Sequence, residues 1–332
     1  MSITLGRCLG HGGFGEVYRG FDMAKGEACA VKAIIRSSDT QLAAKLEREH
    51  RVHSLLSSDP SIVTLHAVYE DATYTYFVMD LCLGGNLRSS HLLNKQNPLD
   101  PEVFRKKRAL LLQILDVVHR CHSKFIFHRD IKPENILLDE NEKRIYLADF
   151  GLVSETADSE DTREGTSEYM SPECYAEFSH RVPFLNAPTD VWALGVLLHR
   201  MMFNALPWAN ASLNSPEFRD FLCDRSGYFL RCRNISKEAH ELLISVFEIV
   251  PENRITIPEF RARLASIQRF FLPPQEAHEL RPVVLTDVDL AWTVSQRARV
   301  SHEYIRFQKR RIRTPLVLPT RPRSKQYHPQ PQ

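Results

Sequence analysis

The residues best suited to chemistry lie in two short stretches, HRDIKPEN at 128–135 and DFG at 149–151. Asn135 and Asp149 offer oxygen ligands of the kind that Mg²⁺ takes together with the phosphates of a substrate. Lys132 can neutralise charge on a phosphoryl group in transfer, and Asp130 can orient a hydroxyl and accept its proton. Phosphoryl transfer requires this positioning and electrostatic stabilisation, with little covalent chemistry by the protein. Eight such residues followed by DFG form a pattern too specific to arise by chance.

A cluster of glycines lies near the start of the chain, in GHGGFGEV at 10–17. Gly10, Gly12 and Gly15 have no Cβ, so the backbone could approach phosphates closely there. A dinucleotide-binding turn needs a helix directly after the glycines, whereas residues 16–20 alternate like a strand. The cluster also lacks the Lys-Ser/Thr ending of a P-loop. By itself it fits equally well a β-hairpin that happens to be rich in glycine.

Lys32 lies in an apolar strand pattern and needs a partner, because an unpaired buried charge is costly. A helix expected at 40–56 can supply that partner. Glu49 is the acid on its apolar face, which it shares at helical spacing with Leu42, Leu46, His53 and Leu56. Glu47 lies on the other side of the helix. We therefore predict a Lys32–Glu49 pair, although a purely structural ion pair would show the same pattern.

Apolar runs and turn signals predict the elements that must position these residues. Five strands are expected in the first 80 residues, at 3–10, 16–21, 28–35, 62–69 and 74–79. Gly84-Gly85 then breaks the chain, and helical patterns follow. Asp100-Pro101-Glu102 is a strong start signal for a helix to about Ser123, and further helices are expected at 189–202, 237–247 and 257–267. A small β-rich lobe and a larger helical lobe would enclose a cleft, where ligand sites tend to lie.

Length and composition exclude several classes of protein. The chain has 332 residues, of which 43% are apolar and 25% charged, so collagen, coiled coil and wholesale disorder are excluded. The formal net charge of +2 predicts no bulk attraction to nucleic acid or membranes. No apolar run approaches the ~20 residues that a bilayer requires, and the first residues do not resemble a signal peptide. The seven cysteines include no CxxC pair, which predicts free thiols in a reducing compartment and no metal site of their own.

The last part of the chain differs from the rest. Residues 273–332 hold 11 Lys and Arg against 5 Asp and Glu and are rich in proline. Such a stretch buries too little apolar area to offset the cost of ordering, so we expect disorder beyond about residue 312. Lys309–Arg313 fits a nuclear-import signal, and it fits a solvated basic tail as well.

The motifs, in their order and spacing, make residues 1 to about 272 resemble the eukaryotic protein kinases. The resemblance implies an α+β, bilobal fold: a small antiparallel β lobe with one helix at 1–79, a hinge at 80–85 and a larger α-helical lobe at 86–272. The basic, proline-rich tail would follow at 273–332. The finer sequence pattern is most similar to fungal kinases of nutrient signalling and meiotic control.

The resemblance implies ATP and Mg²⁺ as cofactors and assigns a role to each motif. Lys32, held by Glu49, would contact the α- and β-phosphates. Asp130 would be the catalytic base and Lys132 would steady the γ-phosphate. The metal ligands would be Asn135 and Asp149. The nucleotide would be covered and lined by Gly10, Gly12, Gly15, Val17, Ala30, Met79, Asp80, Cys82 and Leu137, with Asp80 and Cys82 contributing backbone groups.

Further residues would support the site or set its substrate. By the same resemblance, Asp190 would hold the catalytic loop, and Glu173 would pair with Arg254. Lys132 and the turn Gly165–Tyr169 are typical of kinases that phosphorylate serine or threonine in proteins, with Thr166 bridging Asp130 and Lys132.

Regulation would centre on Arg129, which in such kinases binds a phosphate on the activation segment, here residues 149–173. Thr162 occupies the usual acceptor position. The acids beside it could pair with Arg129 and order the segment without phosphate; they are Glu160, Asp161 and Glu164.

Two departures from the family pattern, at His53 and Asn86, leave alternatives open. His53 stands where Leu or Met is usual, as a neutral packed side chain or as a pH-sensitive brake. Asn86 replaces an acid that basic-directed kinases often have, whereas Glu134 is retained and implies some surviving preference for basic substrates. The alternative function is a pseudokinase scaffold, which should have lost one of Lys32, Asp130, Asn135 or Asp149. We expect instead a monomeric catalytic domain that acts on proteins in the cytoplasm or nucleus, without binding nucleic acid or membranes.

Overall fold

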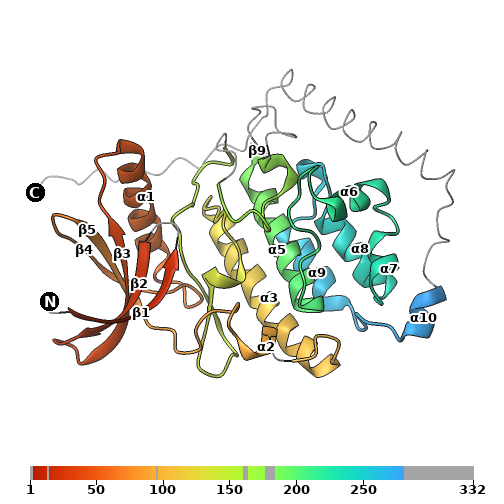
Figure 1. Ribbon diagram of the computed structural model, residues 1–332, viewed down its shortest axis with the longest axis horizontal. Helices are drawn as coiled ribbons and strands as arrows, with labels where there is room; N and C mark the ends of the chain where they lie inside the picture. Colours follow the sequence, from red (N-terminus) through yellow and green to blue (C-terminus); the bar gives the residue numbers. More distant parts are fainter. Residues whose placement is uncertain (1–2, 13–14, 95, 160–163, 176–183, 280–332) are drawn as a thin grey trace, which may run out of the picture.

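The computed structural model describes residues 3–12, 15–94, 96–159, 164–175 and 184–279, which form two lobes (Figure 1). The smaller lobe is a five-stranded antiparallel sheet in the order β1-β2-β3-β5-β4, with the helix α1 (Thr40–Leu56) beside it. The strands are β1 (Ile3–Gly12), β2 (Gly15–Asp22), β3 (Glu27–Ile35), β4 (Leu65–Glu70) and β5 (Tyr74–Asp80). The predicted small β lobe with one helix is therefore present.

The fourth strand is shorter than the sequence predicts. β4 begins at Leu65, and the residues just before it turn towards the larger lobe. Ile62 forms a parallel bridge with Leu147, and the Val63 amide donates to the Leu147 carbonyl at 3.1 Å. Apolar sequence alone does not reveal which lobe a strand-like segment will pair with. The segment ties the two lobes together at the back of the cleft.

The larger lobe is built around two long helices, α3 (Pro101–Ser123) and α5 (Asn186–Phe203). The predicted start of α3 is confirmed, because the Asp100 carboxylate accepts from the Glu102 amide at 2.8 Å. The lobe also contains α2 (His91–Asn94), α6 (Pro216–Cys223), α7 (Tyr228–Cys232), α8 (Lys237–Val246), α9 (Ile257–Ser266) and α10 (Pro274–Glu279). The sequence patterns predicted α8 and α9, whereas α2, α6, α7 and α10 were not predicted.

Aromatic side chains fill the core between α5 and the helices that surround it. Trp192 lies with its ring centroid 5.6 Å from Trp208 and 5.0 Å from Phe247. Trp208 in turn packs against Phe218 and Phe221 of α6 at 5.0 and 5.1 Å. Close-packed rings of this kind make the lobe a rigid base. The stretch at 128–135 attaches to this base through Asp190 of α5, which accepts from the backbone amides of His128 and Arg129.

Short elements at the junction of the lobes carry the chemistry-bearing stretches. The 3-10 turn η1 (Pro133–Asn135) leads into β6 (Ile136–Leu138), which pairs with β7 (Ile145–Leu147) just before Asp149. Further along, β8 (Asp158–Ser159) pairs with β9 (Phe184–Leu185), and the 3-10 turn η2 (Pro172–Cys174) follows the segment at 164–171. These hairpins bring residues 128–135 and 149–151 side by side.

Two broader expectations can be compared with the described residues. No helix among them is long and apolar enough to span a bilayer. The cysteines whose side chains are described are all free thiols: Cys8, Cys29, Cys82, Cys121, Cys174 and Cys223.

Of the expected tail at 273–332, only residues 273–279 are described. Lys309–Arg313 lies outside them.

Candidate active site

Lys32 lies at the centre of a buried cluster of charges. Its Nζ is 2.7 Å from Oε1 of Glu49 on α1, so the predicted pair is present, and it is also 2.7 Å from Oδ1 of Asp149. Burial opposes ionisation of the lysine, but the carboxylates of Asp149 and Glu49 outweigh it and raise the pKa of Lys32. With both carboxylates ionised, the three groups carry one net negative charge. A cation bound next to Asp149 would therefore find a complementary field.

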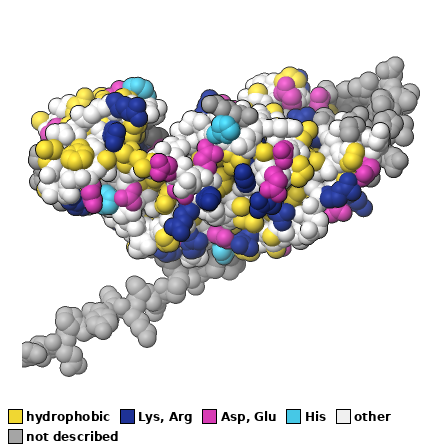
Figure 2. Space-filling model, turned by 90° about the horizontal axis from the view of Figure 1, so that it is seen from below, with side chains coloured by type: hydrophobic (Ala, Val, Ile, Leu, Met, Phe, Trp, Pro, Cys, Tyr) yellow, Lys and Arg dark blue, Asp and Glu magenta, His cyan; other side chains and the backbone are white. Residues whose placement is uncertain are grey.

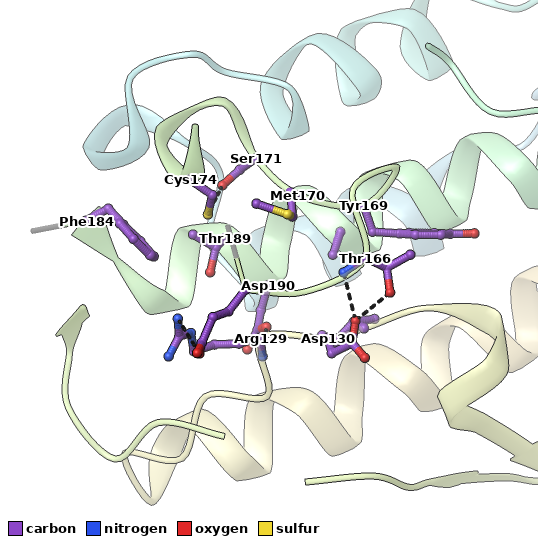
Figure 3. A pocket seen from close by; sticks show the side chains of 13 residues that line it. Arg129, Asp130, Thr166, Tyr169, Met170, Ser171, Cys174, Phe184, Thr189 and Asp190 are labelled. Carbon is purple, nitrogen blue, oxygen red and sulfur yellow. Dashed lines mark hydrogen bonds and ion pairs between the residues drawn. The ribbon is translucent and has the colours of Figure 1, made fainter. Parts of the chain in front are cut away.

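Asp130 is the hub of a second network, on the loop before η1. The Asn135 amide donates to Asp130 Oδ2 at 3.1 Å and to the Asp130 carbonyl at 2.8 Å. Lys132 Nζ lies 2.7 Å from Asp130 Oδ2 and 2.7 Å from Thr166 Oγ1. Thr166 Oγ1 donates to Asp130 Oδ1 at 2.9 Å (Figure 3). Thr166 therefore bridges Asp130 and Lys132 as predicted. A base and a cation are thus held within one hydrogen-bond network.

The catalytic loop is attached to α5 through one buried carboxylate. Asp190 accepts from the backbone amides of His128 and Arg129 at 2.9 and 2.8 Å, and its Oδ2 lies 2.8 Å from Nε2 of His122. Complete burial opposes ionisation, yet the hydrogen bond and charge of His122 and the backbone donors hold the pKa of Asp190 below its usual range. An ionised Asp190 therefore holds the loop in place, as the resemblance implies.

The backbone is strained on both sides of the cleft floor. Arg129 and Asp149 have φ values of 66° and 63°, in the left-handed region that non-glycine residues rarely adopt. Each such residue costs on the order of 1–3 kcal/mol and persists only where its surroundings fix it. Asp190 fixes the first of them and Lys32 contacts the second. The strain aims the neighbouring side chains at one another.

The segment that follows the cleft is anchored to the base by another buried pair. The Arg254 guanidinium donates to both oxygens of Glu173, at 2.6 and 3.0 Å, and neither side chain is exposed to solvent. Arg254 also donates to the carbonyls of Pro188 and Glu248, and its guanidinium lies 4.9 Å from the ring centroid of Trp192. This pair was predicted, and it fixes η2 against α5.

Most of the residues expected to line a nucleotide lie on the strands of the smaller lobe, whereas Cys82 lies in the hinge and Leu137 on β6. Val17 pairs with Gly10 and with Lys32, and Ala30 pairs with Met79. Gly15 must be glycine, because its φ is 151° and a Cβ there would lie 2.3 Å from the Ala33 carbonyl oxygen. Gly12 pairs with Gly15 across the hairpin turn.

In the hinge, the Asp80 amide donates to the Thr64 carbonyl at 3.1 Å and the Cys82 carbonyl accepts from the Gly85 amide at 3.2 Å. The side chain of Asp80 is engaged, with Oδ1 2.7 Å from Nε2 of His66. Burial raises the pKa of the Cys82 thiol to about 12, so it stays protonated. Leu137 lies below the hinge, in a bridge with Asn86. The Asp80 side chain is thus already engaged and the Cys82 thiol is uncharged, while the expected backbone contributions of both residues stay a prediction.

A bound metal ion would take most of its ligands from the nucleotide phosphates and water rather than from the protein. Among the residues described, no three His, Cys, Asp or Glu side chains are grouped so that they could hold a metal alone. Asn135 and Asp149 offer one amide oxygen and one carboxylate beside the cleft. Magnesium binds readily through one or two protein oxygens when phosphates and water complete its shell. The donor set therefore fits a magnesium–nucleotide complex.

Sequence reasoning missed a set of contacts that braces α1 against the activation segment. Lys45 forms an ion pair with Glu164. The other carboxylate oxygen of Glu164 lies 3.7 Å from Nη2 of Arg129, and this second pairing is one that the sequence had suggested. Arg51 Nη1 donates to Glu155 Oε1 at 2.6 Å, and Arg48 donates to the Val153 carbonyl at 3.4 Å. The three bases recur every third residue along α1. That spacing, opposite an acidic segment, was the available signal.

Two other expectations have different outcomes. His53 Nε2 donates to the Val63 carbonyl at 2.7 Å and its ring packs 5.1 Å from Phe150. Burial lowers the pKa of His53 to about 4, which favours the neutral packed side chain over the pH-sensitive brake. Thr162 lies outside the described residues, as do Glu160 and Asp161, so the phosphate acceptor stays a prediction.

A small cavity lies between the catalytic loop and the activation segment (Figure 3). Its lining includes Arg129 and Asp130 of the catalytic loop, Thr166 of the activation segment, and Thr189 and Asp190 of α5. This cavity lies behind the turn and is separate from the nucleotide surface on the smaller lobe, so it belongs to the support of the site. Figure 2 shows the cleft itself as a notch between the two lobes.

Comparison with known proteins agrees with this geometry. The protein kinase domain model matches residues 3–263. The chain is 33% identical over 304 residues to "Negative regulator of sexual conjugation and meiosis" from Schizosaccharomyces pombe, covering 86% of this chain and 63% of that protein. It is 31% identical over 268 residues to "CBL-interacting protein kinase 20" from Oryza sativa subsp. japonica, covering 77% and 55%.

A third relative has the same character. "CBL-interacting serine/threonine-protein kinase 19" from Arabidopsis thaliana is 33% identical over 268 residues, which cover 77% of this chain and 51% of that protein. The chain thus spans between half and two thirds of the length of these relatives. The yeast relative also confirms the predicted similarity to fungal kinases of meiotic control. The chain belongs to the protein kinase family, among the serine/threonine protein kinases.

Proposed function

We propose that this protein is an active kinase that transfers the γ-phosphoryl group of magnesium-bound ATP to serine and threonine hydroxyls of proteins. The observation that supports it best is the convergence of two networks on one cleft. Lys32, Glu49 and Asp149 form the first, and the second joins Asp130 to Lys132, Asn135 and Thr166. Each group stands beside the partner that its role requires.

The residues divide the work of the reaction between them. Lys32 is protonated and fixed by two carboxylates, so it offers a positioned charge to the α- and β-phosphates. A substrate hydroxyl that donates to Asp130 is oriented for in-line attack, and the carboxylate accepts its proton as the new bond forms. Lys132, 2.7 Å from Asp130, neutralises negative charge on the group in transfer. When magnesium is bound, it supplies further charge neutralisation on the phosphates, with Asn135 and Asp149 as its protein ligands.

The geometry disfavours the pseudokinase alternative. A scaffold that only binds nucleotide has no need of a base held against a cation. Here Asp130 receives hydrogen bonds from three side chains and is 7% exposed. The strained backbone at Arg129 and Asp149 is a further cost that serves only the alignment of these groups. Catalysis is the function that explains both features.

The class of substrate, the oligomeric state and the cellular compartment are further parts of this proposal. The turn at 164–171, with Thr166 at Asp130, supports a protein substrate over a small molecule. The net charge of +2 supports a domain that does not depend on nucleic acid or a membrane surface. We propose a monomeric catalytic domain that works in the cytoplasm or nucleus, the latter if Lys309–Arg313 acts as an import signal.

Replacement of the base tests the proposal. Asp130→Asn should abolish turnover of a serine peptide while ATP binding persists, because the loss is confined to the transition state. Asp116→Asn is the matched control, since Asp116 forms an exposed pair with Arg261 on the far side of α3. Steady-state kinetics and nucleotide titration would be measured with magnesium. An Asp130→Asn enzyme, free of contaminating kinase, that kept more than about a tenth of the wild-type kcat would show that the role assignment is wrong.

A further inference from the structure

Glu134 is the acidic residue nearest to the catalytic loop that neither network uses. It lies on η1, four positions after Asp130, with a 28% exposed side chain. A free carboxylate there would attract Arg or Lys in a substrate, next to the hydroxyl that Asp130 receives. The following inference rests on the proposed function, because it concerns which substrates that site accepts.

Arg88 occupies this carboxylate. Its Nη1 donates to Oε1 of Glu134. The backbone of Arg88 is fixed to the same turn, because its amide donates to the Pro133 carbonyl at 3.3 Å and its carbonyl accepts from the Asn94 side chain. Because the backbone of Arg88 is held in place, the guanidinium loses less conformational entropy when it binds Glu134. The pair neutralises Glu134 within the protein.

The second carboxylate oxygen of Glu134 is not accessible to a substrate side chain. Glu134 Oε2 is shielded from solvent and has no hydrogen-bond partner among the described residues. A substrate guanidinium would have to displace Arg88 from Oε1 to reach Glu134. Arg88 and an incoming substrate arginine carry the same charge, so replacing one by the other at Glu134 brings no net electrostatic gain. The two arginines would also repel each other while the replacement takes place.

A second arginine lies on the same side of the site. Arg200 of α5 donates to the hydroxyl of Tyr169 at 3.1 Å. Burial raises the pKa of Tyr169 to about 12, while Arg200 lowers it and Glu134 raises it, so all three lie close together. Glu168 also acts electrostatically on Arg88 and on Tyr169, so two arginines and two carboxylates balance one another here. One oxygen of Glu168 already accepts from the Ser167 hydroxyl at 2.8 Å.

We propose that Arg88 takes the place of a basic substrate residue at Glu134, so that the kinase selects substrates with an uncharged or acidic residue at this subsite. Arg88 is then a specificity-determining residue that acts by exclusion. The sequence alone had favoured a surviving preference for basic substrates, because Glu134 was visible and its partner was not. Specificity of this kind comes from a repulsive element as much as from an attractive one.

The test measures whether removal of Arg88 uncovers Glu134. Peptides with one serine acceptor would carry Arg, Ala or Asp in turn at each flanking position. kcat/KM would be compared for wild type, Arg88→Ala, Arg88→Ala/Glu134→Gln and the control Arg105→Ala. Arg105 suits the comparison because it forms a similarly exposed ion pair with Glu102 on α3, away from the cleft.

At the position read by Glu134, the wild type should use the Arg peptide no better than the Ala peptide. Arg88→Ala should gain a preference for Arg at one position, about three- to tenfold and mainly in KM, as expected for one exposed charge pair. That gain should weaken with added salt and vanish in the double variant. Arg105→Ala should behave as wild type. Arg88→Gln, which keeps more of the side chain's packing, repeats the test if Arg88→Ala does not fold.

Two results would overturn the inference. One is a wild type that already favours Arg at the position where Arg88→Ala does. The other is an Arg88→Ala enzyme with an unchanged ratio of Arg to Ala peptides. Failure of the proposed function gives a different result, because the wild type would then bind ATP and phosphorylate none of the peptides.

Discussion

Buried ionisable groups in this protein differ in whether they keep their charge. Asp190 stays ionised because backbone and His122 donors surround it, and Lys32 because two carboxylates do. His53 and His199 face mainly apolar surroundings, and burial lowers the pKa of each, to about 4 and about 3. A buried charge is tolerated where opposite charges or several hydrogen bonds replace water. Asp190 and Lys32 both belong to the networks of the site.

His53 should make the protein less stable in mild acid. Its pKa is about 4 in the folded state against 6.5 unfolded, so the unfolded chain takes up the proton first. The contribution of neutral His53 to the free energy of unfolding is therefore complete above about pH 6.5 and is lost as the pH falls towards 4. Between pH 7 and pH 5, His53 alone should lower the free energy of unfolding by about 2 kcal/mol. Denaturant unfolding at both pH values would measure it.

The leucine variant isolates this contribution. His53→Leu has no titrating group at the site, so the fall in stability between pH 7 and pH 5 should be about 2 kcal/mol smaller than in wild type. His199 has a low pKa for the same reason and is present in both proteins, so its effect cancels. Equal falls in the two proteins would mean that His53 is charged, or exposed, in the folded state.

The helix α1 acts as a unit because both its faces are engaged. Its inner face delivers Glu49 to Lys32, and its outer face is tied to the activation segment by Lys45, Arg48 and Arg51. Glu164 contacts both Lys45 and Arg129, next to Asp130. One carboxylate thus connects the helix to the catalytic loop, in the place where a phosphate could do the same.

We therefore expect substantial activity without phosphorylation. Phosphatase-treated wild type and Thr162→Ala should both be active, and phosphorylation of Thr162 should add roughly tenfold or less. A phosphate brings more charge and more acceptor oxygens than one carboxylate, which is why a modest gain remains. Steady-state kinetics on the treated proteins would measure it. If both were inactive, dependence on an upstream kinase would replace this idea.

A double-mutant cycle tests the role of Glu164 in that basal activity. In phosphatase-treated enzyme, Glu164→Gln should lower kcat about tenfold, because the link from α1 to Arg129 is lost. Lys45→Met should lower it less, and the double variant should be no worse than Glu164→Gln, since contacting residues are not additive. Glu102→Gln on α3 is the exposed control. Additive losses would show that the two residues act separately.

At the scale of the whole molecule, charge and packing separate the folded body from the end of the chain. Lys, Arg, Asp and Glu side chains are mixed over the face of the larger lobe seen in Figure 2. The described chain ends in α10, which still contacts the body: Ala277 is 2% exposed and Glu276 pairs with Arg269. The excess of basic residues lies beyond it in the sequence.

Two truncations should separate a packed segment from an unnecessary one. Removal of residues after 312 should leave the melting temperature and peptide kinase activity unchanged, because that composition buries little apolar area. Removal of residues after 272 should lower the melting temperature by a few degrees, since it deletes α10 with its buried Ala277. Thermal unfolding and steady-state kinetics would compare both with the full chain. A large change from the first truncation would indicate a docked regulatory segment instead.

Local patterns were enough to predict many parts of the fold and the site. Glu49 was found from helical periodicity, because side chains that share a face of a helix recur at fixed spacing. The start of α3 was found from Asp100, because an N-cap acts within one turn. Asp130, Asn135 and Asp149 were found from a motif, and Thr166 and Arg254 from their place in the same family pattern. Each of these signals is contained in a few neighbouring residues or in a known order of motifs.

The tertiary structure decided which distant charges meet. Residues 61–63 look like a strand but pair with Leu147 of the other lobe. Lys45 meets Glu164 across 119 positions, and Arg88 meets Glu134 across 46. Long polar side chains carry no periodic signal of their partner, because many exposed charges fit many others at similar energy. The sequence by itself thus determined which residues are candidates for catalysis, whereas only the folded chain decided which charges brace α1 and which cation pairs with Glu134.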